Sequence, residues 1–301
     1  MNKLKSITKY ITTYDRTNTY DDTIEEIKRI VSYVEYDILG NLCCDKTFDN
    51  QGFCENICKR IYDKNDFVIE ENLFESEEDA PYESRKNSYD EHGLLIASHV
   101  TYSEEKLTEK FEYNQNGKLN EKKIVYPDGN AFVENKYVWE NDLLIEECDF
   151  DDENSMNLRK RYFYDEKQRL ITLEEHDFNQ DNKVSETYQY NEFGMTNQRV
   201  LNFKGEVMIN RTFLYNEDGL MIERVVESPN HFMRYVFEYN ENKMPVKETA
   251  FNKDDLELTV KEILYNNDNE EVEMNVYSRN ILEDIDELIL IETYTTELEY
   301  F

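Results

Sequence analysis

The stretch YNEDGLMIE (residues 215–223) nearly repeats the stretch YNEFGMTNQ (residues 190–198), which begins 25 residues earlier. In both, a Tyr is followed by Asn, two further residues, a Gly and an aliphatic residue. Gly and Asn tolerate a positive φ, and an Asn or Asp side chain can bond the backbone two residues on. Such a phrase is typical of a tight reversal between strands, so its repetition predicts a chain built of hairpins.

The phrase occurs ten times, at intervals of 24 to 27 residues, and its first residue is Tyr or, once, Trp. We call these ten aromatic residues the anchors: Tyr36, Tyr62, Tyr89, Tyr113, Trp139, Tyr164, Tyr190, Tyr215, Tyr239 and Tyr265. A weaker turn phrase, such as YPDGN at Tyr126 or FNQDN at Phe178, lies midway between several anchors. The underlying period is therefore about 12–13 residues, the length of one strand and one turn.

The segments between the turns alternate in polarity. In EVMINRTFLY (206–215), Val207, Ile209 and Phe213 share one face, interrupted by Arg211. A period of two is the signature of a β-strand. The sequence therefore predicts an all-β fold, in which about ten 25-residue two-stranded repeats form one long, curved or rolled antiparallel sheet. On this basis we expect on the order of twenty strands.

The N-terminal region is less regular than the repeats. In DDTIEEIKRIV (21–31), Ile24, Ile27 and Val31 have helical spacing behind Asp residues that could cap a helix, which predicts a short capping helix. The predicted organisation is an N-terminal cap at 1–30, YD-like β-hairpin repeats at 31–290 and a C-terminal closing strand at 291–301.

The chain is strongly acidic. It has 67 Asp and Glu against 34 Lys and Arg, a net charge of −33, and the acids are spread along its whole length. Such a field repels nucleic acid and anionic membranes, and it attracts basic proteins. The alternative interpretation is that the charge serves only the solubility of an exposed sheet.

Neither a secretory signal nor a membrane span is predicted. No apolar run follows the basic start of the sequence, and none approaches the ~20 residues of a membrane helix. The five cysteines are Cys43, Cys44, Cys54, Cys58 and Cys148. We expect them to be reduced thiols of a cytoplasmic protein. The first four are not spaced as two Cys-x-x-Cys pairs, so no metal site and no cofactor are predicted.

No catalytic motif is present. The sequence lacks a Gly-x-Ser-x-Gly elbow, a phosphate-binding loop and a His-Glu-x-x-His pair. We therefore predict that the chain is not an enzyme. A degenerate hydrolase would instead show a pair of buried carboxylates with raised pKa in a cleft.

The anchors carry a family resemblance. Tyr36-Asp37 with Gly40 and Leu42 resembles the YD repeat of Rhs-type proteins, as does Tyr89-Asp90 with Gly93 and Leu95. That resemblance implies a spiralling β-sheet, which in large members of the family closes into a shell around a toxin. This chain is shorter, several anchors are followed by Asn instead of Asp, and the Gly is missing after several of them, among them Trp139, Tyr239 and Tyr265. What the resemblance implies here is the sheet and not encapsulation. MORN-like repeat antitoxins are a weaker resemblance, because their denser glycine spacing is absent from a chain with 8 Gly.

These observations lead to a functional hypothesis. We expect a protein-binding repeat module, a cytoplasmic immunity protein or antitoxin that neutralises a basic toxin such as a nuclease through its acidic surface. A structural or glycan-binding repeat scaffold is the alternative. The predicted partner is a basic protein, with no nucleic acid and no membrane.

Interruptions of the repeat are the predicted contact sites, because irregular loops on a regular scaffold often carry function. Two are acidic, ESEEDAPYE (75–83) and LEDIDE (282–287), and a third is ESPNHFMRY (227–235). The predicted partner-binding residues are Glu77, Glu78, Asp79, Glu83, Asp284, Asp286, Glu287, His231 and Phe232.

Overall fold

The computed structural model describes residues 3–16, 24–76, 80–279 and 287–301. These residues form 22 β-strands and no helix, and the strands belong to one sheet. Every strand pair with a defined register is antiparallel, as between β12 and β13 or between β20 and β21. The all-β, antiparallel prediction is therefore confirmed.

The strands are short and nearly equal except at the two ends of the chain. Their bounds are β1 Leu4–Arg16, β2 Ile24–Tyr36, β3 Leu42–Phe48, β4 Cys54–Tyr62, β5 Val68–Phe74, β6 Glu83–Tyr89, β7 Leu95–Tyr102, β8 Glu105–Tyr113, β9 Leu119–Val125, β10 Ala131–Glu140 and β11 Leu143–Phe150. They continue with β12 Met156–Tyr164, β13 Leu170–Asp177, β14 Asn182–Tyr190, β15 Met195–Asn202, β16 Val207–Tyr215, β17 Met221–Ser228, β18 His231–Tyr239, β19 Pro245–Phe251, β20 Glu257–Tyr265, β21 Glu271–Arg279 and β22 Leu288–Tyr300.

Two units can be distinguished by their internal packing. One comprises Met1–Lys59, Glu75–Glu78 and Thr212–Phe301, and the other comprises Arg60–Phe74 and Asp79–Arg211. We refer to them as the first unit and the second unit. The candidate pocket and the ion-pair cluster described below both lie within the second unit.

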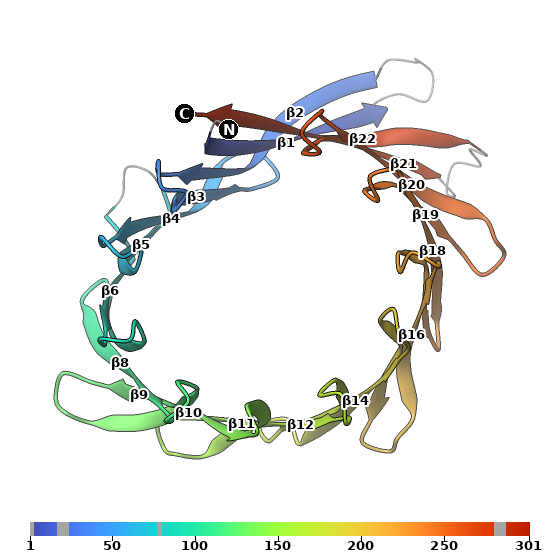
Figure 1. Cartoon of the computed structure of the whole chain (residues 1–301). Helices are drawn as coiled ribbons and strands as arrows, with labels where there is room; N and C mark the ends of the chain where they lie inside the picture. Colours follow the sequence, from blue (N-terminus) through green and yellow to red (C-terminus); the bar gives the residue numbers. More distant parts are fainter. Residues whose placement is uncertain (1–2, 17–23, 77–79, 280–286) are drawn as a thin grey trace. The chain divides into compact units, whose positions relative to one another are not determined.

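The first and last strands are hydrogen-bonded to each other in the first unit. β1 pairs with β2 along one side, where Ile7 faces Val34, and with β22 along the other, where Ile7 faces Leu298. Figure 1 shows β1 beside both partners. Neither side of β1 is therefore left as a free edge.

The predicted capping helix is wrong. Residues 24–36 form strand β2, which pairs with β1 along most of its length, for example Thr13 with Ile27. Ile24 and Ile27, two of the residues whose spacing suggested a helix, are exposed. The spacing of a few isoleucines is a weak signal, and backbone pairing with a neighbouring strand overrides it.

The strong turns have the construction that the sequence predicted. In the turn after Tyr89, the Asp90 N–H donates to the Leu94 carbonyl at 2.9 Å, and the Gly93 N–H donates to the Asp90 carbonyl at 3.1 Å. The Asp90 side-chain oxygen Oδ1 also accepts hydrogen bonds from the backbone N–H groups of His92 and Leu94, both at 2.9 Å. Gly93 has a φ of +81°, so the turn is a type I reversal closed by a residue in the left-handed region.

Some turns place other residues where Gly93 stands. Gln168 has a φ of +61° and Lys243 a φ of +62° at the corresponding positions. The same backbone therefore forms without Gly, at a conformational cost of about 1–2 kcal/mol per residue. This explains why the repeat persists where the sequence phrase has lost its Gly.

The side chains of the anchors donate hydrogen bonds to backbone carbonyl groups of the neighbouring strand. The Tyr164 hydroxyl donates to the Leu144 carbonyl at 2.9 Å, and the Trp139 indole N–H donates to the Leu119 carbonyl at 2.7 Å. The same bond is made by Tyr89 to Val68, Tyr113 to Leu95, Tyr190 to Leu170, Tyr239 to Met221 and Tyr265 to Pro245. The anchor spacing in the sequence thus reflects one hydrogen bond repeated from strand to strand.

Replacement of Gly93 by Ala is expected to destabilise the second unit more than replacement of Gly129 by Ala. A Cβ on Gly93 would lie 2.6 Å from Cζ of Phe67, whose ring stacks on Tyr89, whereas a Cβ on Gly129 meets nothing within 4 Å. Both substitutions incur the left-handed penalty of about 1–2 kcal/mol, and only Gly93→Ala adds the displacement of a packed ring. Urea unfolding of the two variants measures the difference. Equal losses would mean that the Phe67 ring moves aside without cost.

Candidate functional site

Glu83, one of the predicted contact residues, lies in a buried ion-pair cluster. Its carboxylate pairs with Arg85, and Arg85 Nη1 also donates to Glu109 Oε2 at 2.9 Å. Lys122 Nζ then lies 3.0 Å from Glu109 Oε1 and 2.7 Å from Glu134 Oε2. Glu83 and Glu109 are both buried. We call these five residues the acid–base cluster.

The cluster lies among the best-buried positions of the second unit. Arg85 is directly across from Val100, and Glu109 is directly across from Ile124; both aliphatic residues are buried. Burial removes the water that would otherwise stabilise each charge, so the members depend on one another. The Glu83 carboxylate is therefore engaged with Arg85 inside the sheet.

The other predicted contact residues fall into two groups. Glu287 and His231 are exposed, and Phe232 is half-buried beside His231 in the hairpin of β17 and β18. Glu77, Glu78, Asp79, Asp284 and Asp286 lie outside the described residues. Their role in binding a partner stays a prediction.

The five cysteines, all within the described residues, form no disulfide bond. Cys44, Cys58 and Cys148 are buried, and burial raises the pKa of the Cys44 and Cys148 thiols. Within the described ranges, no three His, Cys, Asp or Glu side chains are grouped so that they could hold a metal ion. The same part of the chain contains no helix of the length and apolarity that crossing a membrane requires.

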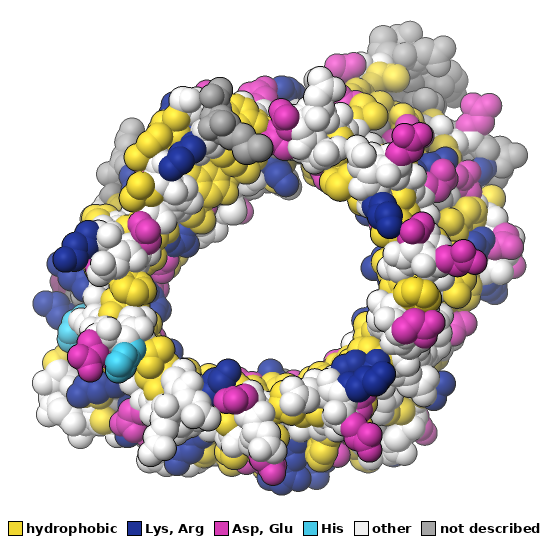
Figure 2. Space-filling model, in the orientation of Figure 1, with side chains coloured by type: hydrophobic (Ala, Val, Ile, Leu, Met, Phe, Trp, Pro, Cys, Tyr) yellow, Lys and Arg dark blue, Asp and Glu magenta, His cyan; other side chains and the backbone are white. Residues whose placement is uncertain are grey.

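Most cations that form ion pairs do so with carboxylates of the same sheet. Lys123 Nζ lies 2.6 Å from Glu112 and 2.7 Å from Glu121, and Arg234 pairs with both Glu223 and Asp255. Figure 2 shows the resulting intermingling of dark-blue cations and magenta carboxylates on the visible face. Because acids outnumber bases by 33, the carboxylates left over set the sign of the field.

Several tyrosines are tied to carboxylates. The Tyr162 hydroxyl donates to Glu147 Oε2 at 2.9 Å, and the Tyr188 hydroxyl donates to Glu186 Oε2 at 2.6 Å. Burial and these hydrogen bonds to carboxylates raise the pKa of both phenols well above the ordinary value of 10.0. Both groups are therefore neutral hydrogen-bond donors at any physiological pH.

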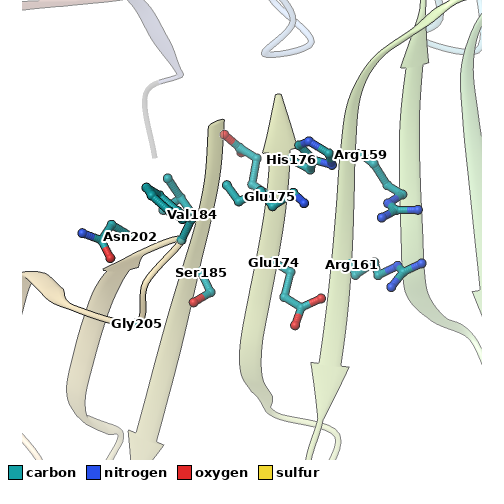
Figure 3. Close-up of a pocket in the computed structure, with 11 residues that line it drawn as sticks. Arg159, Arg161, Glu174, Glu175, His176, Val184, Ser185, Asn202 and Gly205 are labelled. Carbon is teal, nitrogen blue, oxygen red and sulfur yellow. The ribbon is translucent and has the colours of Figure 1, made fainter. Parts of the chain in front are cut away.

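A pocket of about 410 Å³ opens on the second unit across β12, β13, β14 and the turn after β15. It is lined by Arg159, Arg161, Glu174, Glu175, His176, Lys183, Val184, Ser185, Asn202, Phe203 and Gly205. Figure 3 shows the labelled lining side chains on neighbouring strands, with Arg159 beside His176 and Arg161 beside Glu174. The volume lies within the range of small-molecule sites, roughly 300–1,000 Å³.

The turn and strand pattern of the sequence does not reveal this pocket, although the sequence carries a signal for it. Arg159, Lys160 and Arg161 are the one run of three consecutive basic residues in a chain of net charge −33. Alternation of side chains along β12 places Arg159 and Arg161 on one face and Lys160 on the other. The basic run lies within an ordinary strand between two turns, so it does not interrupt the repeat and was not singled out.

No family model and no curated protein matches the chain. Among solved structures it is distantly similar to a crystal structure of TcdB2-TccC3-Cdc42, with a TM-score of 0.48 and 11% identity over 90% of this chain. A structure of TcdB2-TccC3 without the hypervariable C-terminal region gives a TM-score of 0.32 and 11% identity over 96% of this chain. The chain spans 17% and 20% of the length of those two. A porin-like protein from Bacteroides uniformis gives a TM-score of 0.37 and 8% identity, with 98% of each chain covered. These are distant likenesses of β-structure.

Proposed function

We propose that the chain is a protein-binding repeat module that neutralises a basic partner, as an immunity protein or antitoxin neutralises a toxin. The observation that carries this proposal is uncompensated negative charge: the net charge is −33, while the ion-paired cations are engaged within the sheet. A basic protein would supply the charge that the chain lacks.

The ion-pair geometry sharpens the argument. Lys122, Lys123 and Arg234 each contact two carboxylates, so a single cation is shared between acids instead of neutralising one completely. Side chains at the turns add exposed acids, such as Asp181 and Glu91, whose side chains are 91% and 87% exposed. A single-sign field of this kind accelerates association with an oppositely charged protein.

The resemblance of the anchors to YD repeats supports the toxin-related part of the proposal, since large proteins of that family handle toxins. A nuclease is one fitting partner, because the Lys and Arg residues that it uses to bind phosphates would meet carboxylates here. Cytoplasmic location, the absence of catalysis and the absence of nucleic-acid and membrane partners belong to the same proposal.

Glycan binding by a structural scaffold is the second candidate. Its specific support is a set of aromatic residues that are exposed at turns, including Phe53 at 68% and Phe203 at 70% exposure. Exposed rings can stack on sugars. Binding of this type would depend little on ionic strength.

The decisive experiment is affinity capture of partners from the source cell, followed by elution in a salt gradient and an activity assay of the captured protein. We expect one basic protein that elutes at high salt and whose activity the chain inhibits stoichiometrically. Reversal of Glu77, Glu78 and Asp79 to Lys should weaken binding by at least tenfold.

A matched control reverses Asp152, Glu153 and Glu166, three exposed turn residues, to Lys and so changes the net charge equally. Retained binding in this control would locate the contact at 75–83, and equal loss in both variants would assign binding to the general field. Binding that ignores salt and survives both reversals would contradict the proposal and favour the scaffold.

A further inference from the structure

A row of basic side chains crosses three strands at the pocket. Arg159 on β12 faces His176 on β13, and His176 faces Lys183 on β14. Residues that face each other across an antiparallel pair lie on the same side of the sheet. The three side chains therefore point to one side, and Arg159 and Lys183 stand two strand spacings apart, roughly 10 Å.

The neighbouring rows are arranged differently. Arg161 faces Glu146 on one side and Glu174 on the other, and its Nε donates to Glu146 Oε2 at 3.1 Å. On the opposite side of the sheet, Lys160 pairs with Glu175 at 3.8 Å. Arg159 differs from Arg161, because the residue that faces it on β11 is Cys148 and not a carboxylate.

Arg159 and Lys183 consequently have no counter-charge of their own. Among the described residues, neither forms an ion pair, in a chain where acids outnumber bases by 33. Basic side chains placed next to each other repel. The carboxylates around the pocket lie next to other groups: Glu175 pairs with Lys160, Glu174 is across from Arg161, and Asp181 contacts His176. The space between Arg159 and Lys183 can therefore hold an anion from outside.

The row is held in place by an aromatic ring. The Phe178 ring centroid lies 3.8 Å from that of His176 and 5.9 Å from the Arg159 guanidinium carbon. The Phe178 N–H donates to the Asn157 carbonyl at 2.9 Å, which fixes the ring against β12. His176 Nε2 lies 3.4 Å from the exposed Asp181 carboxylate, which orients the imidazole.

The rest of the pocket is too large for an inorganic ion alone. Its volume is about 410 Å³, and the Phe203 side chain, 70% exposed, stands at its rim beside Gly205. Ser185 adds a hydroxyl to the lining. An exposed ring at the edge of a charged pocket offers a stacking surface for the organic part of a ligand.

We propose that this pocket binds the phosphate monoester of a small organic molecule. The phosphate lies between Arg159 and Lys183, and the organic part lies against Phe203. A phosphate monoester carries up to two negative charges, which matches two unpaired cations better than a single carboxylate does. A nucleic-acid chain is disfavoured, because the acidic remainder of the surface repels its further phosphates.

The test is isothermal titration calorimetry of the full chain with adenosine monophosphate, inorganic phosphate and adenosine. We expect saturable binding of the monophosphate, weaker binding of inorganic phosphate and none of adenosine. Lys183→Gln and Arg159→Gln should each weaken the binding of both anions by about tenfold. Phe203→Ala should weaken the monophosphate several-fold and leave inorganic phosphate unchanged.

Lys110→Gln is the matched control, because Lys110 is an exposed cation of the second unit on another strand, β8, and forms no ion pair with a described residue. Thermal melts confirm that each variant is folded, and Lys183 is exposed enough for its replacement to leave the fold intact. The site is overturned if neither anion binds saturably, or if Lys110→Gln weakens binding as much as Lys183→Gln. Equal affinity for both anions, unaffected by Phe203→Ala, would overturn the assignment of an organic ligand.

Discussion

Replacement of Glu109 by Gln is expected to lower the free energy of unfolding by about 3 kcal/mol, the lower end of what breaking a buried ion pair costs. Glu109 is buried and contacts Arg85 at 2.9 Å and Lys122 at 3.0 Å. The amide keeps the shape of the side chain but removes its charge. Two partly buried cations then share the remaining carboxylates of the acid–base cluster, Glu83 and Glu134.

Glu112→Gln is the control for this prediction. Glu112 lies on the same strand and pairs with Lys123 at 2.6 Å, but its side chain is 59% exposed. An exposed pair contributes about 0–1 kcal/mol. Urea unfolding of the two variants beside the parent chain measures both values. Similar small losses would show that water enters the acid–base cluster and that its burial does not strengthen the pairing.

The second large effect is expected at alkaline pH, where the chain should unfold as pH rises above 10. Burial, often with a hydrogen bond to a carboxylate, raises the pKa of many tyrosines above 10.0, including Tyr162, Tyr188 and the anchors Tyr164 and Tyr190. Below pH 10 these phenols are protonated in both the folded and the unfolded chain. Above pH 10 the unfolded chain loses the protons first, so it binds fewer protons than the folded chain and stability falls with rising pH.

Each phenol that stays protonated in the folded state contributes a slope of up to about 1.4 kcal/mol per pH unit. Two lysines act in the same direction. Burial alone would lower the pKa of Lys122 and Lys123, but their Glu partners raise both pKa values above the ordinary value. The measurement follows tyrosinate absorbance and circular dichroism together. We expect one cooperative step in both signals, with a smaller pH dependence in Tyr162→Phe. Gradual ionisation of all tyrosines near pH 10 with the fold intact would contradict this account.

The features that could be predicted from the sequence are local ones. The Asp90–Leu94 turn depends on residues within five positions, and the alternation along 206–215 depends on its own backbone. Both were found correctly. The strand structure of 24–30, which was assigned to the N-terminal cap, was missed because it depends on pairing with β1, which lies outside any short window. The anchor spacing was found, but not that the Tyr164 hydroxyl reaches the Leu144 carbonyl.

The pocket shows the same limit. Arg159 is visible in the sequence as part of a basic run, whereas His176 and Lys183 join it only through the registers of two strand pairs. Those registers follow from β-bulges and turn lengths, and a shift by one residue would move the side chains to the opposite face. Of the predicted contact residues, Glu83 lies in the acid–base cluster, a role that its place in the acidic loop did not indicate.

The pairing of β1 with β22 has a consequence for the order of folding. In the described strands, the other registered pairs join successive strands, whereas Thr8 faces Glu297. Closing so long a loop costs more chain entropy than forming a hairpin, so we expect this seam to form last and slowly. Until it forms, β1 and β22 each present unpaired backbone groups that can pair with another copy of the chain. Refolding yield should therefore fall steeply with protein concentration, and the vulnerable interval ends when these two strands meet.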